Sequence, residues 1–229
     1  SKQVMTLGWL IVATSRAYAE SSETLRAHRD KVRVIPLGID ADKLVDTAAV
    51  ARSIEIRKRF DRPLVVFVGR LVHYTGLGCL IEAMRGLRAQ LLIVGSGPLE
   101  GELRALTARL VLEGQVLFQA VPRSESVAPY LLACDLAVLP SIDRTEAFGL
   151  SLLEAMACGK PVIATELGTG TSWVCEDGVN GLVVPPRDSG ALRRAIERLL
   201  SDPELSRRLG EAGRRKARSL FSLSGMAGS

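Results

Sequence analysis

Aromatic residues, cysteine and histidine are scarce in this 229-residue chain, and each shortage excludes a class of protein. Only 4% of the residues are aromatic against 47% that are hydrophobic, so the core must be built from Val, Leu, Ile and Ala. Basic residues are not interleaved with aromatic ones, which argues against a nucleic-acid partner. The cysteines form no Cys-x-x-Cys pair and lie in apolar runs, at Cys79, Cys134, Cys158 and Cys175. They predict small buried side chains in a reducing, cytoplasmic compartment, not a disulfide framework or a zinc site.

Long hydrophobic runs are absent as well. The longest, such as residues 7–13, fall short of the roughly 20 residues that a helix needs to cross a bilayer. Residues 1–12 have no Arg-rich segment followed by a small-residue cleavage site, so we expect no signal peptide. His28 and His73 lack the spacing of metal ligands, and Asp40-Ala-Asp42 is expected to start a helix rather than to bind a metal. We therefore expect no catalytic metal and no cofactor.

The net charge of +5 is concentrated near the C-terminus. Residues 187–229 contain ten Lys or Arg and five Asp or Glu, so the rest of the chain is neutral overall. Two interpretations remain open. The basic residues can form the solvated face of two amphipathic helices, or they can contact anionic lipid headgroups and place the chain peripherally at the inner membrane face.

Short β-branched runs alternate with helical patterns along the whole chain. The run at 64–69 is apolar at almost every position, which is typical of a strand buried on both faces. The alternation predicts an α/β fold, a Rossmann-like doubly wound parallel sheet with helices on both faces, as one domain over residues 1–229. The predicted strands are 9–13, 32–36, 64–69, 91–95, 116–119, 136–140, 161–164 and 182–184, and the main predicted helices are 77–84, 99–110, 148–158, 191–200 and a last one from 203.

Ligands of such folds bind beyond the carboxyl ends of the strands, so the residues that follow each strand are candidates for a site. Gly69 lets the backbone approach a ligand and Arg70 offers a bidentate fork for phosphate, although an ordinary turn with a surface arginine explains this pair equally well. Gly95-Ser-Gly-Pro resembles the start of a dinucleotide fingerprint. Glu100 occupies its third glycine position and the strand at 116–119 lacks a ribose-binding acid, so a tight turn is expected and an NAD-dependent dehydrogenase is disfavoured.

The segment after the strand at 136–140 carries two carboxylates. Glu154 interrupts an otherwise apolar helix, where a carboxylate is costly unless it meets a donor such as a ligand hydroxyl or an internal cation. Glu146 precedes the unpaired N–H groups of Phe148, Gly149 and Leu150, which suit an anion, and it can equally serve the helix dipole. After the strand at 161–164, the run of small residues at 168–172 predicts a nest of amide donors for a second phosphate.

These residues together resemble a family. The segment from Glu146 to Glu154 and on through Ala-Met-Ala-Cys-Gly-Lys-Pro-Val is similar to the E-x7-E segment of retaining nucleotide-sugar glycosyltransferases with the GT-B fold, family 4. Further matching motifs occur in the family's order and spacing, over roughly residues 10–220. They are Val-Ile-Pro-Leu-Gly-Ile-Asp at 34–40, Val-Gly-Arg-Leu at 68–71, Gly-Ser-Gly-Pro at 95–98, Ala-Cys-Asp at 133–135 and Gly-Val-Asn-Gly-Leu-Val-Val-Pro at 178–185.

The resemblance implies roles for the candidate residues. Glu154 would bind the ribose hydroxyls of a nucleotide-sugar donor, Glu146 would contact the transferred sugar, and Arg70 beside Gly69 would neutralise the diphosphate. The implied amide donors are those of Phe148, Gly149 and Leu150 and those of Gly168, Thr169, Gly170 and Thr171, while Val121 and Arg123 would flank the base. The donor would be a UDP- or GDP-hexose, with GDP-mannose suggested by 168–172, and the acceptor a glycan or a lipid-linked sugar.

Two departures from the family affect this prediction. Thr75 occupies the position of the family's diphosphate lysine, and Lys160 or an arginine could replace that charge. The family's first domain, which binds the acceptor, is missing, so the chain corresponds to the donor-binding half and the isolated chain is expected to be inactive. The alternative function is a nucleotide-sugar-binding module without catalysis.

Overall fold

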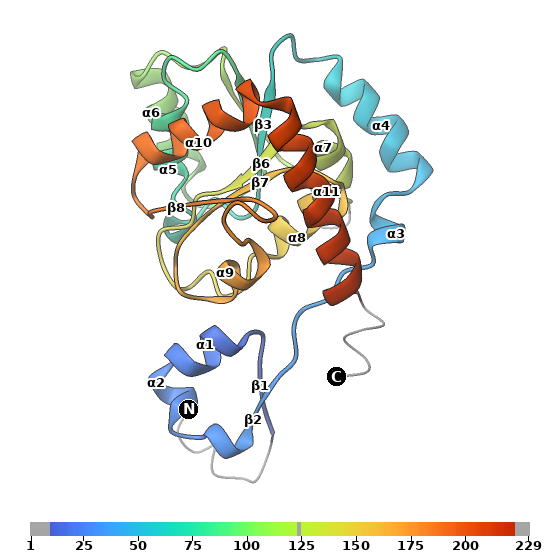
Figure 1. The fold of residues 1–229 in the computed structure, drawn as a ribbon. Coiled ribbons are helices and arrows are strands. Elements are labelled where there is room, and N and C mark those ends of the chain that lie inside the picture. Colours follow the sequence, from blue (N-terminus) through green and yellow to red (C-terminus); the bar gives the residue numbers. More distant parts are fainter. Residues whose placement is uncertain (1–9, 123–124, 223–229) are drawn as a thin grey trace.

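The computed structural model describes residues 10–122 and 125–222, and most of them surround one large parallel sheet (Figure 1). This sheet has the strand order β5-β4-β3-β6-β7-β8, and all its neighbouring strands run parallel. Its strands are β3 (Leu64–Val68), β4 (Gln90–Val94), β5 (Val116–Gln119), β6 (Leu136–Leu139), β7 (Val162–Thr165) and β8 (Leu182–Val184). The predicted α/β fold with a doubly wound parallel sheet is confirmed.

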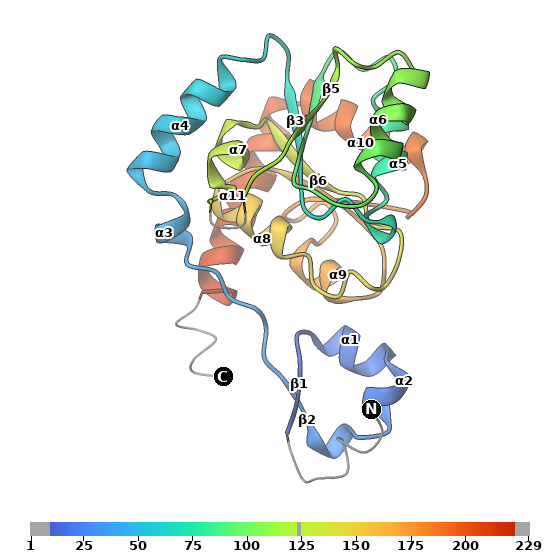
Figure 2. The same cartoon turned by 180° about the vertical axis from the view of Figure 1, so that it is seen from behind.

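Helices cover both faces of this sheet (Figures 1 and 2). On one face α5, α6 and α10 pack against one another, and on the other α7 and α8 lie on the strands, with α4 packed against α7 and α11 against α8. The helices are α1 (Arg16–Ser21), α2 (Glu23–Arg26), α3 (Ala41–Leu44), α4 (Thr47–Arg57), α5 (Leu77–Ala83), α6 (Glu100–Arg109), α7 (Ala128–Ala133), α8 (Leu150–Ala157), α9 (Gly170–Val174), α10 (Ser189–Ser201) and α11 (Pro203–Leu220).

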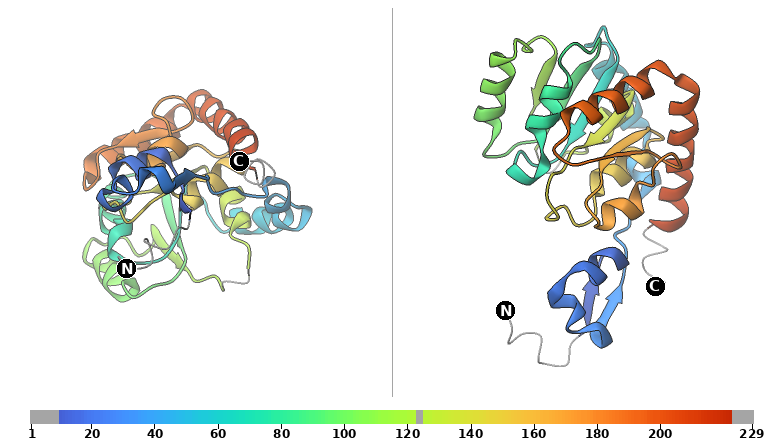
Figure 3. Two further views of the ribbon diagram at one scale, coloured as in Figure 1. Left: turned by 90° about the horizontal axis from the view of Figure 1, so that it is seen from below. Right: turned by 60° about the vertical axis from the view of Figure 1, so that its left-hand side comes forward.

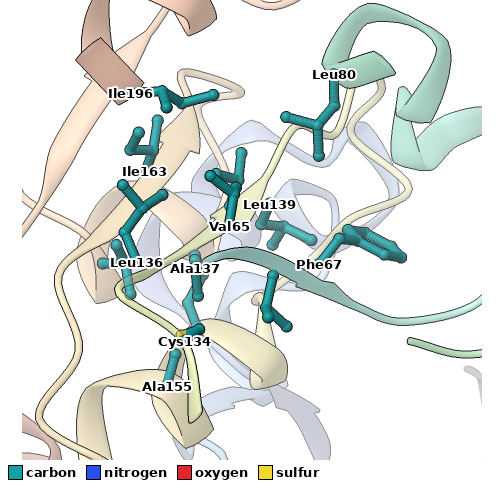
Figure 4. Packing of buried hydrophobic residues seen from close by; sticks show 14 of the residues in the cluster. Val65, Phe67, Leu80, Cys134, Leu136, Ala137, Leu139, Ala155, Ile163 and Ile196 are labelled. Carbon is teal, nitrogen blue, oxygen red and sulfur yellow. The ribbon is translucent and has the colours of Figure 1, made fainter. Parts of the chain in front are cut away.

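The core is aliphatic, as the scarcity of aromatic residues predicted. Val65 and Phe67 of β3 are fully buried and pack beside Leu139 of β6, with Leu80 of α5 and Ile196 of α10 nearby (Figure 4). Strands covered on both faces need apolar side chains at every position, which is why their sequences do not alternate. Each buried leucine or valine contributes about 1.5–3 kcal/mol relative to an exposed one.

The first two strands do not join this sheet, which the prediction of a single sheet did not anticipate. β1 (Ile11–Ala13) and β2 (Val32–Val34) pair only with each other and, with α1 and α2, lie apart from the six-stranded sheet (Figure 3). Leu10 and Val12 are 57% and 54% exposed, so this small sheet is not covered as the larger one is. The extended segment 35–40 then leads the chain away to α3. The single-domain organisation stays a prediction.

Every predicted strand is present within two residues of its expected ends, except that residue 9 lies outside the described residues. The predicted helices are present as α5, α6, α8, α10 and α11, and Asp40 caps α3 by accepting the Lys43 N–H at 3.0 Å, as expected for a helix start. The sequence patterns did not predict α4 or α7. In the described part of the chain, no helix combines the length and the hydropathy that crossing a membrane requires.

The basic C-terminal helices bury one face and expose the other. Leu192 of α10 and Leu209 of α11 are fully buried. Arg207, on the exposed face of α11, forms ion pairs of 2.7 Å with both Glu204 and Glu211. This arrangement agrees with a solvated amphipathic pair, and contact with a lipid surface stays a prediction.

The sheet has one topological switch point, between β3 and β6. From β3 the chain moves outward through β4 to β5, then returns through α7 to β6 on the other side of β3. Loops that leave β3 and β6 therefore diverge and leave room for a ligand at their carboxyl ends. Those loops begin at Gly69-Arg70 and at Pro140-Ser141.

Candidate functional site

One cavity of about 530 Å³ opens at the carboxyl ends of β3 and β4 and beside the loop after β5, and a second cavity of the same volume adjoins it. We call the first the strand-end cavity; its lining includes Gly69, Arg70, Gly97, Val121 and Glu154. We call the second the helix cavity; it lies among α3, α4, α7 and α8, and its lining includes Asp40, Lys43, Arg52, Pro129 and Glu154. Leu44, Glu125, Ser126 and Glu154 line both, so the two cavities meet at Glu154.

Glu154 projects from the middle of α8 among buried neighbours. Leu153 and Ala155, on either side of it in the sequence, are both fully buried. Within residues 10–122 and 125–222, no donor or cation pairs with its carboxylate, and burial raises its pKa to about 7. Among the described residues, the internal salt bridge that the sequence left open as an alternative is therefore not formed. A carboxylate held in this way gains most from a ligand that donates hydrogen bonds.

Glu146 lies in the loop that leads from β6 to α8. Its Oε1 accepts the N–H of Gly149 at 3.1 Å, and its Oε2 accepts the hydroxyl of Ser141 at 3.4 Å. Burial raises the pKa of Glu146, and these two hydrogen bonds partly oppose the shift. The contact with Gly149 is the helix-start interaction that the sequence allowed, so the carboxylate is oriented rather than free.

The N-terminus of α8 rests on an aromatic cluster. Phe148, 3% exposed, makes edge-to-face contacts with Trp173 at 6.3 Å and with Phe221 at 5.9 Å between ring centroids. The carbonyl of Phe221 accepts the N–H of Ile39 at 2.8 Å, which ties the end of α11 to the segment that precedes α3. Leu150 is 43% exposed at the first turn of α8, whose leading N–H groups have no acceptor inside the helix.

The segment 168–171 braces this loop, which the sequence did not predict. The hydroxyl of Thr169 donates to the carbonyl of Glu146 at 2.8 Å, and the N–H of Gly170 donates to the carbonyl of Ala147 at 2.9 Å. The N–H of Gly168 is taken by Glu166 at 2.9 Å, and Thr171 bonds to Thr169. The expected nest of free amide donors is therefore not formed in this structure, and donor contacts for Gly168, Thr169, Gly170 and Thr171 stay a prediction.

Arg70 is exposed at the rim of the strand-end cavity. Its guanidinium has no partner among the described residues, so it is free to bind an anion. The loop that carries it is hydrogen-bonded to the loop after β4, from the Leu71 N–H to the Ser96 carbonyl at 3.0 Å. Gly97 is needed for that contact, because a Cβ there would lie 2.4 Å from the Leu71 carbonyl oxygen. The turn expected for Gly95-Ser-Gly-Pro is thus confirmed.

Two residues that the sequence connected with the diphosphate, Thr75 and Lys160, lie away from both cavities. Thr75, at the position of the family lysine, is 3% exposed and its hydroxyl donates to the Val72 carbonyl at 2.7 Å, so it lines neither cavity. Lys160 donates to the Cys134 carbonyl at 2.7 Å beyond the C-terminal end of α8, so the suggestion that it replaces the lysine is wrong. Arg123 lies outside the described residues.

Sequence reasoning missed the pair Arg52 and Glu125. Arg52 of α4 pairs with Glu125, in the loop after β5, at 3.1 Å across the mouth of the helix cavity. Arg52 also lies 5.9 Å from the ring centroid of Tyr130. The residues are 73 positions apart and α4 has no strong amphipathic pattern, so no local signal could have found this pair.

Geometry thus sorts the predicted residues into two groups. Gly69, Arg70, Val121 and Glu154 share the strand-end cavity. Glu146, Phe148, Gly149 and Leu150 lie in the loop before α8 and at its first residue, and this loop is braced by 168–171. A cation, a hydrogen-bond-seeking carboxylate and a helix N-terminus suit a phosphorylated ligand that also carries hydroxyls. In the described part of the chain, no three His, Cys, Asp or Glu side chains gather as a metal site would require.

The sequence was compared with family models and with known proteins. A family model described as "Glycosyl transferases group 1" matches residues 52–216. The D-rhamnosyltransferase WbpZ of Pseudomonas aeruginosa is 39% identical over 211 residues, which cover 92% of this chain and 55% of that protein. The O-antigen chain mannosyltransferase C of Escherichia coli is 39% identical over 212 residues, covering 92% of this chain and 56% of that protein. The chain therefore spans about half the length of these relatives.

Solved structures share the fold over nearly the whole chain. Anabaena Alr3699/HepE, in complex with UDP-glucose, superposes with a TM-score of 0.85 at 25% identity, over 95% of this chain and 61% of that one. Sucrose-phosphate synthase (tll1590) from Thermosynechococcus elongatus has a TM-score of 0.80 at 34% identity, over 95% of this chain and 55% of that one.

Proposed function

Because the chain belongs to the group 1 glycosyl transferases, we propose that it is the donor-binding half of a retaining GT-B enzyme of family 4. The donor is a hexose carried on UDP or GDP, and the acceptor is a hydroxyl of a glycan or of a lipid-linked sugar. The relatives named for mannosyl and rhamnosyl transfer support a hexosyl group such as mannosyl, and the neighbour solved with UDP-glucose supports UDP.

One observation carries this proposal: Glu154 is half-buried, has no partner among the described residues and lines both cavities. A ribose presents two adjacent hydroxyls, which satisfy the two oxygens of a carboxylate. The nucleoside would then occupy the strand-end cavity, with Val121 beside its base.

The remaining groups serve the diphosphate and the sugar. Arg70 supplies positive charge at the rim of the same cavity, and the first turn of α8 adds N–H donors. Glu146, held by Ser141 and Gly149, contacts hydroxyls of the transferred sugar. Preorganised donors that face the departing diphosphate stabilise the charge that develops as the bond to the sugar breaks.

The transfer keeps the anomeric configuration. The bond between the anomeric carbon and the phosphate oxygen breaks, and the acceptor oxygen forms its bond on the same face of the sugar. The proton of the acceptor hydroxyl passes to the departing phosphate oxygen, so the step requires no nucleophile from the protein.

Transfer requires an acceptor-binding domain that precedes this half. A sheet of two parallel strands is not stable on its own, and β1 and β2 leave Leu10 and Val12 exposed. We propose that these strands complete the sheet of that domain. For the isolated chain the second candidate, nucleotide-sugar binding without catalysis, is favoured by Thr75, which occupies the position of the family's diphosphate lysine.

Isothermal titration calorimetry with GDP, UDP, GDP-mannose, UDP-glucose and NAD tests the proposal. We expect binding of at least one nucleoside diphosphate and none of NAD. Glu154→Ala should weaken that binding at least about tenfold, since one lost hydrogen bond to a charged group removes about 1.5–3 kcal/mol. Its circular dichroism spectrum should match that of the wild type.

Exposed Glu113→Ala serves as the control, because this carboxylate lies outside both cavities. Tight NAD binding without a response to GDP or UDP would contradict the proposal, as would unchanged affinity in folded Glu154→Ala. Sugar transfer by the isolated chain would remove the second candidate.

A further inference from the structure

Two threonines from the neighbouring β7–α9 connection hold the loop that carries Glu146. Thr165 is the last residue of β7 and Thr169 is the N-cap of α9. The two threonines are 2% and 0% exposed. Because both hydroxyls are buried, they form their hydrogen bonds with neighbouring protein groups. Those groups show which part of the structure the threonines hold in place.

Thr169 holds Glu146 by its backbone. Its Oγ1 lies 2.8 Å from the Glu146 carbonyl oxygen and 3.0 Å from the Oγ1 of Thr171. A hydroxyl has a single proton. The carbonyl can only accept, so Thr169 donates to Glu146 and Thr171 donates to Thr169. The result is a buried chain of two hydrogen bonds that ends on Glu146.

Thr165 acts on the carboxylate of Glu146 through Ser141. The Thr165 hydroxyl donates to the Ser141 carbonyl, and the Ser141 hydroxyl donates to Oε2 of Glu146 at 3.4 Å. Oε1 accepts the N–H of Gly149 at 3.1 Å. Each carboxylate oxygen of Glu146 thus has one donor. Ser141, which donates to Oε2, is itself held by Thr165 at the end of β7.

Gly170 completes the attachment. Its N–H donates to the Ala147 carbonyl at 2.9 Å, so two consecutive carbonyls of the Glu146 loop are bound by consecutive residues. A Cβ at position 170 would lie 2.6 Å from that same carbonyl oxygen. The loop therefore cannot shift relative to the β7–α9 connection without breaking several buried hydrogen bonds.

From this arrangement we infer that Thr165 and Thr169 are positioning residues, which hold the Glu146 carboxylate where it meets the transferred sugar. The inference rests on the proposed function, in which Glu146 contacts that sugar. It reassigns Thr169 from a direct contact with the donor to a support of Glu146. Groups held by packing and by hydrogen bonds from neighbouring residues bind their ligand more tightly than groups that must be ordered first.

The test compares a nucleotide sugar with its own nucleoside diphosphate in the full chain. GDP-mannose is compared with GDP, and UDP-glucose with UDP; the pair that the wild type binds is then used for every variant. The measured quantity is the ratio of the Kd of the nucleotide sugar to the Kd of the nucleoside diphosphate. Glu146→Ala should raise this ratio, because only the nucleotide sugar reaches Glu146.

Thr169→Val should raise the same ratio about threefold to tenfold, the value of one hydrogen bond, while Thr169→Ser should restore it. In the Glu146→Ala background, Thr169→Val should leave the ratio unchanged, because a residue that acts through Glu146 has nothing left to position. Thr107→Val is the matched control: Thr107 is also buried and donates to the Leu103 carbonyl at 2.8 Å, within α6. It should lower stability without changing the ratio. Thr165→Val and Thr165→Ser provide a second series if Thr169→Val does not fold.

The outcomes separate the inference from the proposed function. No binding of any nucleotide by the wild type refutes the proposed function. Wild-type binding with an unchanged ratio in folded Thr169→Val and Thr165→Val overturns the inference alone. An equal effect of Thr169→Val with and without Glu146 also overturns it, since the threonine would then act independently of that carboxylate.

Discussion

Gly97 lies directly against the backbone of Leu71, so that an added Cβ would come within 2.4 Å of the Leu71 carbonyl oxygen and 2.6 Å of its nitrogen. This contact joins the loop after β3 to the loop after β4 and closes one wall of the strand-end cavity. The glycine-rich sequence there allows close contact between two protein loops.

Gly97→Ala should therefore lower the free energy of unfolding by about 1–3 kcal/mol, as overpacking against rigid backbone does. Gly101→Ala is the control, since a Cβ there meets nothing within 4 Å and the residue lies in α6. This control should gain about 0.5–1 kcal/mol from helix propensity. Urea denaturation measures the free energy of unfolding, which should fall in Gly97→Ala and rise in Gly101→Ala. Equal changes in the two variants would contradict the loop contact.

Val111 has a left-handed backbone, with φ of 57°, and its side chain is 83% exposed. A β-branched residue is strained there and gains nothing from burial. Val111→Asn should stabilise the chain by about 1 kcal/mol, because Asn tolerates this region. The control is Val179→Asn, which is 56% exposed and whose φ is not positive. A melting temperature that rises equally in both variants would exclude strain at position 111 as the cause.

Burial raises the pKa of Glu154 from its ordinary 4.5 to about 7, which makes stability depend on pH. The folded state holds this proton more tightly than the unfolded state, so the burial penalty is absent below pH 4.5 and complete above pH 7. The free energy of unfolding should fall across this window by at most about 3 kcal/mol. Glu154→Gln should abolish the decrease in unfolding free energy that Glu154 causes between pH 4.5 and pH 7, and it should stabilise the chain at pH 8. Denaturation at pH 5 and pH 8 measures it, with Glu113→Gln as the exposed control.

Arg70 should contribute to diphosphate binding without contributing to stability, because its guanidinium is exposed and unpaired within the described residues. Arg70→Gln should weaken the binding of GDP or UDP about tenfold to a hundredfold. The loss should shrink as salt rises, since salt screens the charge that the variant lacks. Arg62→Gln, an exposed arginine outside both cavities, is the control. Equal affinities in the Arg70 and Arg62 variants would remove Arg70 from the site.

Local patterns were sufficient where burial decides the structure. The apolar run at 64–68 and the mostly apolar helix at 150–157 specify buried elements by themselves, and the carboxylate of Glu154 is conspicuous because, apart from Ser151, the rest of its helix is apolar. The parallel sheet also follows from the alternation of strands and helices, but its strand order and the separate pairing of β1 with β2 do not.

Contacts between distant segments could not be predicted in this way. The bond from Thr169 to Glu146 exists because β6 and β7 are neighbours in register, from Ala137 with Val162 to Leu139 with Ala164. Lys160 was considered for the diphosphate because its charge suits that role, but the direction of α8 places it at the opposite end of the helix. Residue type alone contains neither kind of information.

The hydrogen bond from the Ile39 N–H to the Phe221 carbonyl joins the chain just before α3 to the chain just after α11. The segment between these two positions contains the large sheet and lines both cavities. Its two ends therefore lie next to each other. A segment whose ends are adjacent can be exchanged for the matching segment of a relative, because the rest of the backbone has to span only the length of one hydrogen bond. If the proposed function holds, chimaeras cut at these two positions should take the donor preference of the inserted piece and the acceptor preference of the host.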